Sequence, residues 1–286
     1  MSRPSETVLL TVLALVAFAS NSILTRLALG AGAMDAATFT TVRLLAGACG
    51  LAAIVRAQAG PSPVGRGGGR GLIGPVALFA YAAPFTFAYV RIGAATGALL
   101  LFGAVQITMI GWGIAMGERP RVRSWLGIAA AAGGLAWLVL PSLRRPDPVG
   151  SALMVVAGGA WGVYSLAGKK ATNALAANAR SFVWAVPLAL LLNLAAASSV
   201  AVSARGVLLA AISGGVTSGL GYAIWYRALR GLTATQAGIV QLSVPVIAAA
   251  GAVVFLHESV NPRLAISGAA VIGGLALVLS DRARAA

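Results

Sequence analysis

The sequence contains very little charge. Only 9% of its 286 residues are Asp, Glu, Lys or Arg, whereas 59% are hydrophobic, and a typical soluble domain carries about 25% charged residues. Because so few polar side chains cannot cover a folded surface in water, lipid must be the solvent for most of the chain. This composition excludes a soluble enzyme and predicts an integral membrane protein.

Acidic residues are scarce and lie away from the middle of every apolar run. The six are Glu6, Asp35, Glu118, Asp147, Glu258 and Asp281. A carboxylate buried in the membrane is the usual carrier of a coupling proton or sodium ion. Its absence favours facilitated diffusion or exchange over tight ion coupling.

Histidine and cysteine each occur once, as His257 and Cys49. A membrane enzyme such as a prenyltransferase or lipid phosphatase needs clustered carboxylates for a metal or a histidine nucleophile. The sequence therefore predicts that the protein is not an enzyme, and we expect no cofactor and no metal site. Cys49 is interpreted as a small hydrophobic residue.

Long apolar runs dominate what is present. Cut at charges, prolines and glycine-rich stretches, they predict ten transmembrane helices, since about 20 apolar residues cross a bilayer. The expected spans are 7–27, 36–55, 71–90, 93–115, 124–141, 149–168, 181–198, 206–226, 233–255 and 263–280. The N-terminal run continues past Ala19, so we interpret it as a span and not as a cleaved signal.

The net charge of +15 follows from membrane orientation and does not require a nucleic-acid partner. Because successive spans cross in opposite directions, the segments between them lie on alternate sides of the membrane. This places fourteen Lys and Arg residues on one side and six on the other, and Arg43, inside a span, completes the 21. The positive-inside rule then predicts that both termini are cytoplasmic.

The two halves of the chain are similar at an offset of 140 residues. Glu118 aligns with Glu258, and the Gly-Gly-Leu-Ala sequence at 133–136 aligns with the same sequence at 273–276. Five spans per copy turn the second copy over in the membrane. We therefore expect an all-α fold of ten transmembrane helices as two inverted five-helix repeats, residues 1–142 and 143–286, an arrangement typical of secondary transporters.

These features resemble the EamA-type members of the drug/metabolite transporter superfamily. The resemblance rests on Arg43 in the second span, the closely spaced third and fourth spans, Gly-Glu-Arg at 117–119, His-Glu-Ser at 257–259 and the following Gly-Gly helices. Within that superfamily the chain is most similar to bacterial inner-membrane exporters of aromatic and other amino acids.

The first repeat departs from the family pattern, because Pro245 of the ninth span has no counterpart in the fourth. We therefore expect more flexure in the ninth span.

Polar and aromatic side chains inside the spans are the candidate binding residues, because intramembrane polar groups usually face a cavity or another helix. Trp161 and Tyr164 share a helix face, as do Tyr81 and Phe85. An amide offers both donors and an acceptor, so Gln106 and Gln241 together are suited to the ammonium and carboxylate groups of a zwitterion. The candidate substrate-binding residues are Asn21, Tyr81, Phe85, Gln106, Trp161, Tyr164, Tyr222, Trp225 and Gln241. Contacts between helices, or anchoring at the membrane interface, are the alternatives for these side chains.

Three further residues are candidates for structural or gating roles, namely Arg43, Pro245 and His257. Arg43 can extend to the interface, bind a substrate carboxylate or bond facing helices, and the resemblance favours a structural role.

The sequence as a whole predicts an amino-acid exporter of the bacterial inner membrane that works by alternating access around a midplane cavity. A broader metabolite or drug exporter is the alternative. The expected partners are the lipid bilayer and a small-molecule substrate, with the protein a monomer or weak homodimer.

Overall fold

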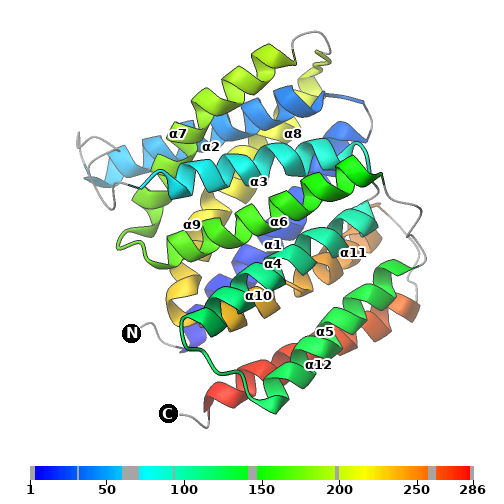
Figure 1. The fold of residues 1–286 in the computed structure, drawn as a ribbon. Helices are drawn as coiled ribbons and strands as arrows, with labels where there is room; N and C mark the ends of the chain where they lie inside the picture. The colour runs from blue at the N-terminus through cyan, green and yellow to red at the C-terminus, as the bar shows by residue number, and fades with distance from the viewer. Residues whose placement is uncertain are drawn as a thin grey trace.

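The computed structural model describes residues 4–30, 32–59, 71–92, 94–140, 147–196, 200–256 and 262–283, which form a bundle of helices (Figure 1). Apart from one isolated bridge between Met34 and Val202, these ranges contain no β-structure. They include nine helices long and apolar enough to cross a membrane, and a shorter apolar helix at Ile73–Tyr89. The expected all-α multi-pass membrane protein is confirmed at this level, and the count of ten spans stays a prediction.

The helices of the first half agree with the apolar runs of the sequence to within a few residues. They are α1 (Pro4–Leu29), α2 (Ala36–Ala59), α3 (Ile73–Tyr89), α4 (Ala94–Ala115) and α5 (Val122–Val139).

The second half contains more breaks than its hydropathy predicts. It consists of α6 (Pro148–Lys169), α7 (Ala174–Ala195), α8 (Ala204–Ile212), the π-helix η3 (Ser213–Leu220), α9 (Gly221–Ala228), the 3-10 turn η4 (Leu229–Gly231), α10 (Ala234–Val240), α11 (Ser243–Leu256) and α12 (Pro262–Ala283). The eighth expected span is thus α8, η3 and α9 in succession, and the ninth is α10 and α11.

The predicted start of the seventh span at 181 is wrong. Helix α7 begins at Ala174, because the side chain of Asn173 accepts a hydrogen bond from the amide of Ala176 and caps the first turn. Arg180, which the predicted bounds leave outside the span, lies inside the helix.

The ninth span is interrupted at Gln241 and Leu242, between α10 and α11. Pro245 lies in the first turn of α11, where a missing backbone N–H removes no helical hydrogen bond. Helix α4, its counterpart in the first half, is continuous. The greater flexure expected for the ninth span stays a prediction, and His257 lies outside the described residues.

Glu118, just after α4, connects that helix to the start of α10. Its carboxylate accepts hydrogen bonds from the backbone amides of Ala234 at 2.6 Å and Thr235 at 3.0 Å. Partial burial raises the pKa of this carboxyl, but the hydrogen bonds from Thr235 and Ala234 and the charge of Lys169 outweigh burial and hold the pKa below its ordinary value. The ionised carboxylate also stabilises the positive end of the α10 dipole.

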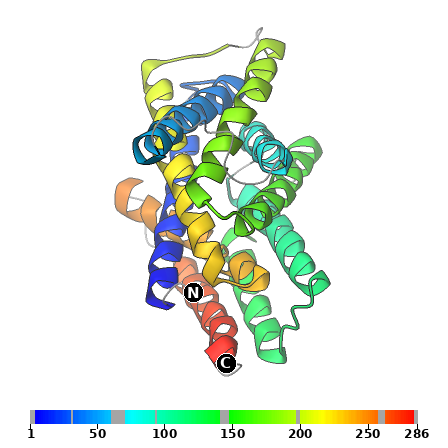
Figure 2. The same cartoon turned by 90° about the vertical axis from the view of Figure 1, so that its left-hand side faces the viewer.

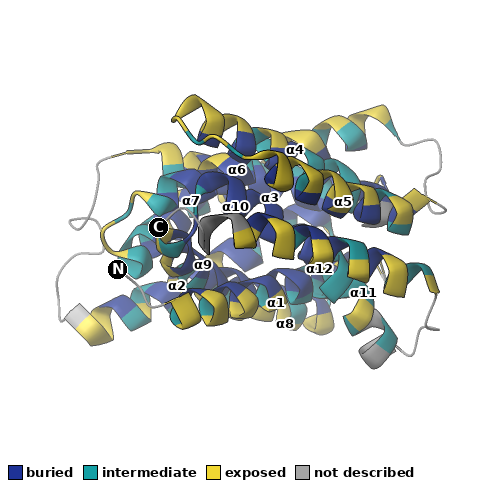
Figure 3. Ribbon diagram, turned by 90° about the horizontal axis from the view of Figure 1, so that it is seen from below, coloured by how far each residue is buried: buried dark blue, intermediate teal, exposed yellow. Residues whose placement is uncertain are grey.

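The distribution of buried and exposed residues is the one expected in lipid, with apolar side chains on the outside and polar ones between the helices. Figure 3 shows exposed residues along the outward sides of the helices and buried residues between them. The exposed set includes Leu9, Ile107, Leu126 and Leu194, whereas buried positions include Asn21, Arg43 and Gln241. Apolar side chains outside and polar ones inside are what a lipid environment requires.

Helices α5 and α12 pack closely side by side at one edge of the bundle in both Figure 1 and Figure 2. Their contact depends on glycine, because a Cβ on Gly274 would lie 2.4 Å from the carbonyl oxygen of Gly127, whereas one on Gly273 would meet nothing within 4 Å. The beginning of α1 and the end of α12 lie on the same side of the bundle in these views.

Candidate functional site

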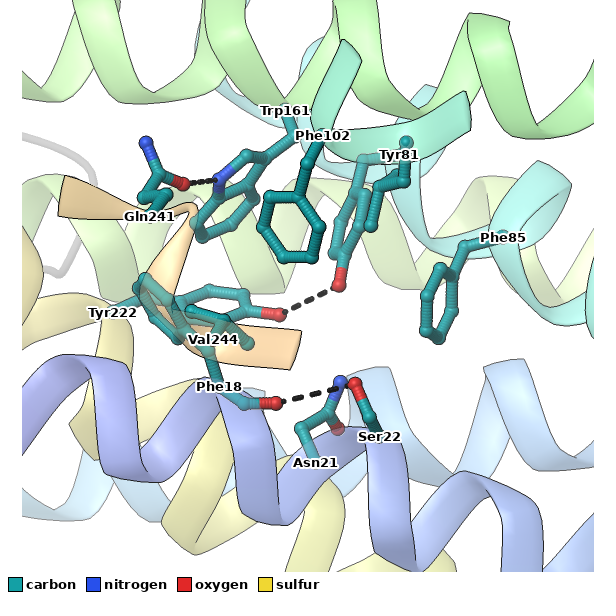
Figure 4. A pocket seen from close by; sticks show the side chains of 11 residues that line it. Phe18, Asn21, Ser22, Tyr81, Phe85, Phe102, Trp161, Tyr222, Gln241 and Val244 are labelled. Atoms are coloured by element: carbon teal, nitrogen blue, oxygen red, sulfur yellow. Dashed lines mark hydrogen bonds between the residues drawn. The ribbon is translucent and has the colours of Figure 1, made fainter. Parts of the chain in front are cut away.

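A small cavity of about 30 Å³ lies in the middle of the bundle, and we call it the central cavity (Figure 4). Its lining comes from α1, α3, α4, α6, α9 and the segment around the α10–α11 break. The lining residues are Phe18, Asn21, Ser22, Tyr81, Phe85, Leu101, Phe102, Trp161, Tyr222, Gln241 and Val244. Six of the nine candidate binding residues are therefore brought together here, namely Asn21, Tyr81, Phe85, Trp161, Tyr222 and Gln241.

Aromatic rings form most of the wall of the central cavity. The ring of Trp161 lies 4.7 Å from that of Tyr222, 4.9 Å from that of Tyr81 and 5.1 Å from that of Phe18, measured between centroids. The Trp161–Phe18 pair meets edge to face, at an interplanar angle of 86°. Such contacts contribute about 0.5–1.5 kcal/mol each beyond area burial, so the cluster both shapes and stabilises the cavity.

Three candidate residues lie outside the cavity wall. Tyr164 packs behind Trp161 at 5.6 Å and hydrogen-bonds Asn178. The indole of Trp225 donates to Ser165 at 3.0 Å. The side-chain amide of Gln106 donates to a backbone carbonyl of α10. All three are buried, and in this conformation they support neighbouring helices.

The two candidate glutamines both bond to α10. Gln106 donates to the carbonyl of Gly238 at 2.7 Å, and Gln241 donates to the carbonyl of Ala237 at 2.8 Å. The oxygen of Gln241 accepts from the indole nitrogen of Trp161 at 2.5 Å. Gln241 therefore faces the cavity with its polar atoms already bonded within the protein, and it holds Trp161 against the end of α10.

Asn21 is fixed from the side of the π-helix. Its side-chain oxygen accepts from Ser213 at 2.6 Å and from Thr217 at a longer 3.5 Å. In Figure 4 its amide group points toward the hydroxyls of Tyr81 and Tyr222. A hydroxyl-rich π-helix therefore positions a polar donor on the cavity wall, and π-helical segments are frequent at functional sites.

Arg43 lies directly behind the tyrosines and is 1% exposed. Its guanidinium donates to Tyr222 at 2.6 Å and to Ser218 at 3.0 Å, with a longer contact to Tyr81 at 3.5 Å. Its carbon Cζ also lies 5.9 Å from the ring centroid of Phe85. Arg43 is thus adjacent to three side chains of the cavity wall.

The charge of Arg43 has no acidic partner among the described residues. The described carboxylates that form ion pairs are Glu6 with Arg227 and Asp147 with Arg91. Nitrogen Nη1 of Arg43 is buried and makes no hydrogen bond there. A buried cation without a counter-charge is costly, so the site favours a negatively charged group next to the tyrosine hydroxyls.

Sequence reasoning missed the other five wall residues, Phe18, Ser22, Leu101, Phe102 and Val244. Phe18 shares a helix face with Asn21, three residues on, and that spacing was a usable signal. The polar run Ser213–Ser218 carried another signal, because five Ser, Thr or Gly residues within an apolar span indicate close packing or a site.

The cavity offers aromatic faces, tyrosine hydroxyls, an amide and one adjacent cation. Among the described residues, no cluster of His, Cys, Asp or Glu is placed to hold a metal ion. Groups of these kinds are suited to an amphipathic ligand, through apolar contact and hydrogen bonding. The volume of about 30 Å³ accommodates only water-sized molecules, so a larger ligand enters only when the surrounding helices move.

Comparison with known proteins gives matches of three kinds. Residues 148–280 match the model of the EamA-like transporter family. The chain is 48% identical over 277 residues to a Pseudomonas aeruginosa protein called "Uncharacterized protein PA1977", a match that covers 97% of this chain and 96% of the relative. A solved structure described as "Crystal structure of protein" has a TM-score of 0.81 at 20% identity and covers 99% of this chain and 100% of its own, a likeness of fold.

Proposed function

The chain carries an EamA-family domain of the drug/metabolite transporter superfamily, and on that premise we propose that it exports amino acids, aromatic or other neutral ones among them, by alternating access. The observation that carries this proposal is the buried charge of Arg43 beside the aromatic cavity. A substrate carboxylate supplies the missing counter-charge, and an apolar or aromatic body fits the rings of Trp161 and Tyr81.

An inverted repeat is part of the proposal, with halves 1–142 and 143–286. The contacts between helices support it, because they occur in related pairs when the halves are exchanged. Helix α3 packs on α6 as α1 packs on α9, and α4 packs on α6 as α1 packs on α11. Likewise α2 contacts α8 and η3, as α7 contacts α3. Such a symmetry permits the two halves to rock about the central cavity.

The break at Gln241–Leu242 is where we propose that the cavity opens. Backbone hydrogen bonding changes there between α10 and α11, and the Trp161–Gln241 hydrogen bond spans the break. Opening this contact enlarges a cavity that is too small for an amino acid in the present conformation. Within this proposal both termini are cytoplasmic, the membrane is the bacterial inner membrane, and the protein works as a monomer or weak homodimer.

Counterflow in proteoliposomes tests the proposal. Vesicles loaded with unlabelled L-phenylalanine or L-leucine are expected to accumulate the labelled amino acid, with saturation, whereas phenylethylamine, which lacks the carboxylate, is not expected to compete. Flux of other metabolites without any amino-acid flux would favour the broader exporter instead. Concentrative uptake driven by an imposed pH gradient would contradict facilitated transport.

A further inference from the structure

A second, larger cavity lies toward one end of the bundle, where α6 ends and α7 begins. Its volume is about 290 Å³, and it is bounded by the start of α3, the connection 170–173, the first turns of α7 and the ring of Tyr226. We call it the basic cavity. Its size falls near the lower end of the range for small-molecule sites, about ten times the space of the central cavity.

The charged side chains on the wall of the basic cavity are both positive. Lys170 and Arg180 line it together with Thr172, Asn173 and Ser181, and none of the described lining residues is acidic. The ammonium of Lys170 also lies 5.3 Å from the ring centroid of Trp112. The planar guanidinium of Arg180 is the cation whose fork of N–H groups matches a carboxylate.

The wall is braced by the protein itself. Arg230 donates to the carbonyls of Ala171 at 3.1 Å and Thr172 at 2.5 Å, which fixes the connection between α6 and α7. Asn173 caps α7, and the hydroxyl of Ser181 bonds to the carbonyl of Ala177 at 2.9 Å. The cavity therefore does not depend on a loosely held loop.

Two tyrosines separate the two cavities. The ring of Tyr226, on the wall of the basic cavity, packs against that of Tyr164 at a centroid distance of 5.0 Å, and its hydroxyl donates to the backbone carbonyl of Tyr164 at 3.1 Å. Tyr164 in turn packs against Trp161 and Tyr222, which line the central cavity. We call Tyr164 and Tyr226 the tyrosine layer. Gly168 makes room for it, because a Cβ on that residue would lie 2.1 Å from the ring of Tyr226.

From this geometry we propose that the basic cavity is a binding site for a small organic carboxylate, with Arg180 as the principal binding cation. The hydroxyl of Thr172 and the side-chain NH2 of Asn173 supply further donors, and the ring of Tyr226 supplies an apolar face. The site is distinct from the central cavity, and this inference stands whether or not amino acids are the transported substrate.

Isothermal titration of the purified full-length protein in nanodiscs tests the charge preference. The probes are phenylacetate, phenylethylamine and benzyl alcohol, which share a ring and differ in charge. We expect phenylacetate to bind at least tenfold more tightly than the other two, and Arg180→Gln to weaken it at least tenfold. Arg180→Lys should recover part of the affinity, and Arg56→Gln, which removes the same charge elsewhere, should leave it within twofold.

Cysteine protection locates the bound anion. In a Cys49→Ser background, Thr172→Cys places a thiol on the cavity wall and Ala115→Cys places one at the exposed end of α4. Phenylacetate is expected to slow alkylation at position 172 severalfold and not at position 115. Equal binding of the three probes, an affinity insensitive to Arg180→Gln in a variant that remains folded by size exclusion, or no protection at position 172 would each overturn the proposal. Failure of amino-acid counterflow would leave these readouts unchanged and would count only against the proposed transport.

Discussion

The guanidinium of Arg43 lies 2.6 Å from the hydroxyl of Tyr222, and this hydrogen bond joins the second helix of the chain to α9 across 179 residues of sequence. The same cation is 3.5 Å from the hydroxyl of Tyr81. The two tyrosines bond the guanidinium unequally, although both rings line the central cavity. This difference provides a matched pair of substitutions.

Tyr222→Phe should destabilise the protein more than Tyr81→Phe. Removing the Tyr222 hydroxyl leaves a buried, charged donor with one acceptor fewer, which costs about 1–3 kcal/mol, whereas the long contact to Tyr81 is weak. Thermal unfolding in detergent, followed by tryptophan fluorescence, measures both. Equal losses of stability would mean that the Arg43–Tyr222 bond is not the stronger one in solution.

Glu118→Gln should lower stability near neutral pH by about 1 kcal/mol, because a neutral amide interacts more weakly with the amides and dipole of α10. The pKa of Glu118 is held below its ordinary value, so the contribution of the carboxylate is fully present above about pH 4.5. It is lost as the pH falls through the lower pKa of the folded protein.

Unfolding temperatures of wild type and Glu118→Gln should therefore converge under acidic conditions. Glu6→Gln is the control, since it removes a carboxylate from an exposed pair with Arg227, and such pairs contribute little. A gap between Glu118→Gln and wild type that persists in strong acid would show that the carboxylate charge is not responsible.

Gly274→Ala should destabilise the α5–α12 pair, and Gly273→Ala should not. A Cβ at position 274 would lie 2.4 Å from the backbone oxygen of Gly127, whereas a Cβ at position 273 would meet nothing within 4 Å. Overpacking costs about 1–3 kcal/mol, and replacing an unconstrained helical glycine by alanine favours the helix by up to about 1 kcal/mol. Unfolding temperatures of the two variants should move in opposite directions, and a shared direction would contradict the packing described for α5 and α12.

Gly168→Ala should displace the ring of Tyr226 and join the two cavities. The new Cβ would lie 2.1 Å from that ring, and the ring is buried, so it cannot move aside without opening the layer it forms with Tyr164. We expect faster alkylation of a cysteine placed at Phe102, on the central cavity, in the Cys49→Ser background. The matched control is Gly133→Ala, whose Cβ meets nothing within 4 Å and should leave that rate unchanged. An unchanged rate in Gly168→Ala, in a folded protein, would argue against the tyrosine layer as the barrier.

Hydropathy predicts the position and order of helices well where a span is one uninterrupted helix, as in α4 and α6. It fails at breaks, because a π-helix at Ser213–Leu220 or a turn at Gln241 changes hydrogen bonding without changing composition. It also misplaced the start of α7, since a charge such as Arg180 can lie within the first turns when its side chain lines a polar cavity.

The sequence by itself determined that this chain resides in lipid, that it is helical, and that fixed negative charge is kept out of its spans. These properties follow from transfer free energies, which are additive along the chain. Only the tertiary structure decided that Asn21, Tyr81, Trp161 and Tyr222 share one wall, that Gln241 bonds inward, and that Arg43 has no acidic partner among the described residues. Those outcomes depend on the rotation and contact of helices distant in sequence, where small residues such as Gly214 allow close approach.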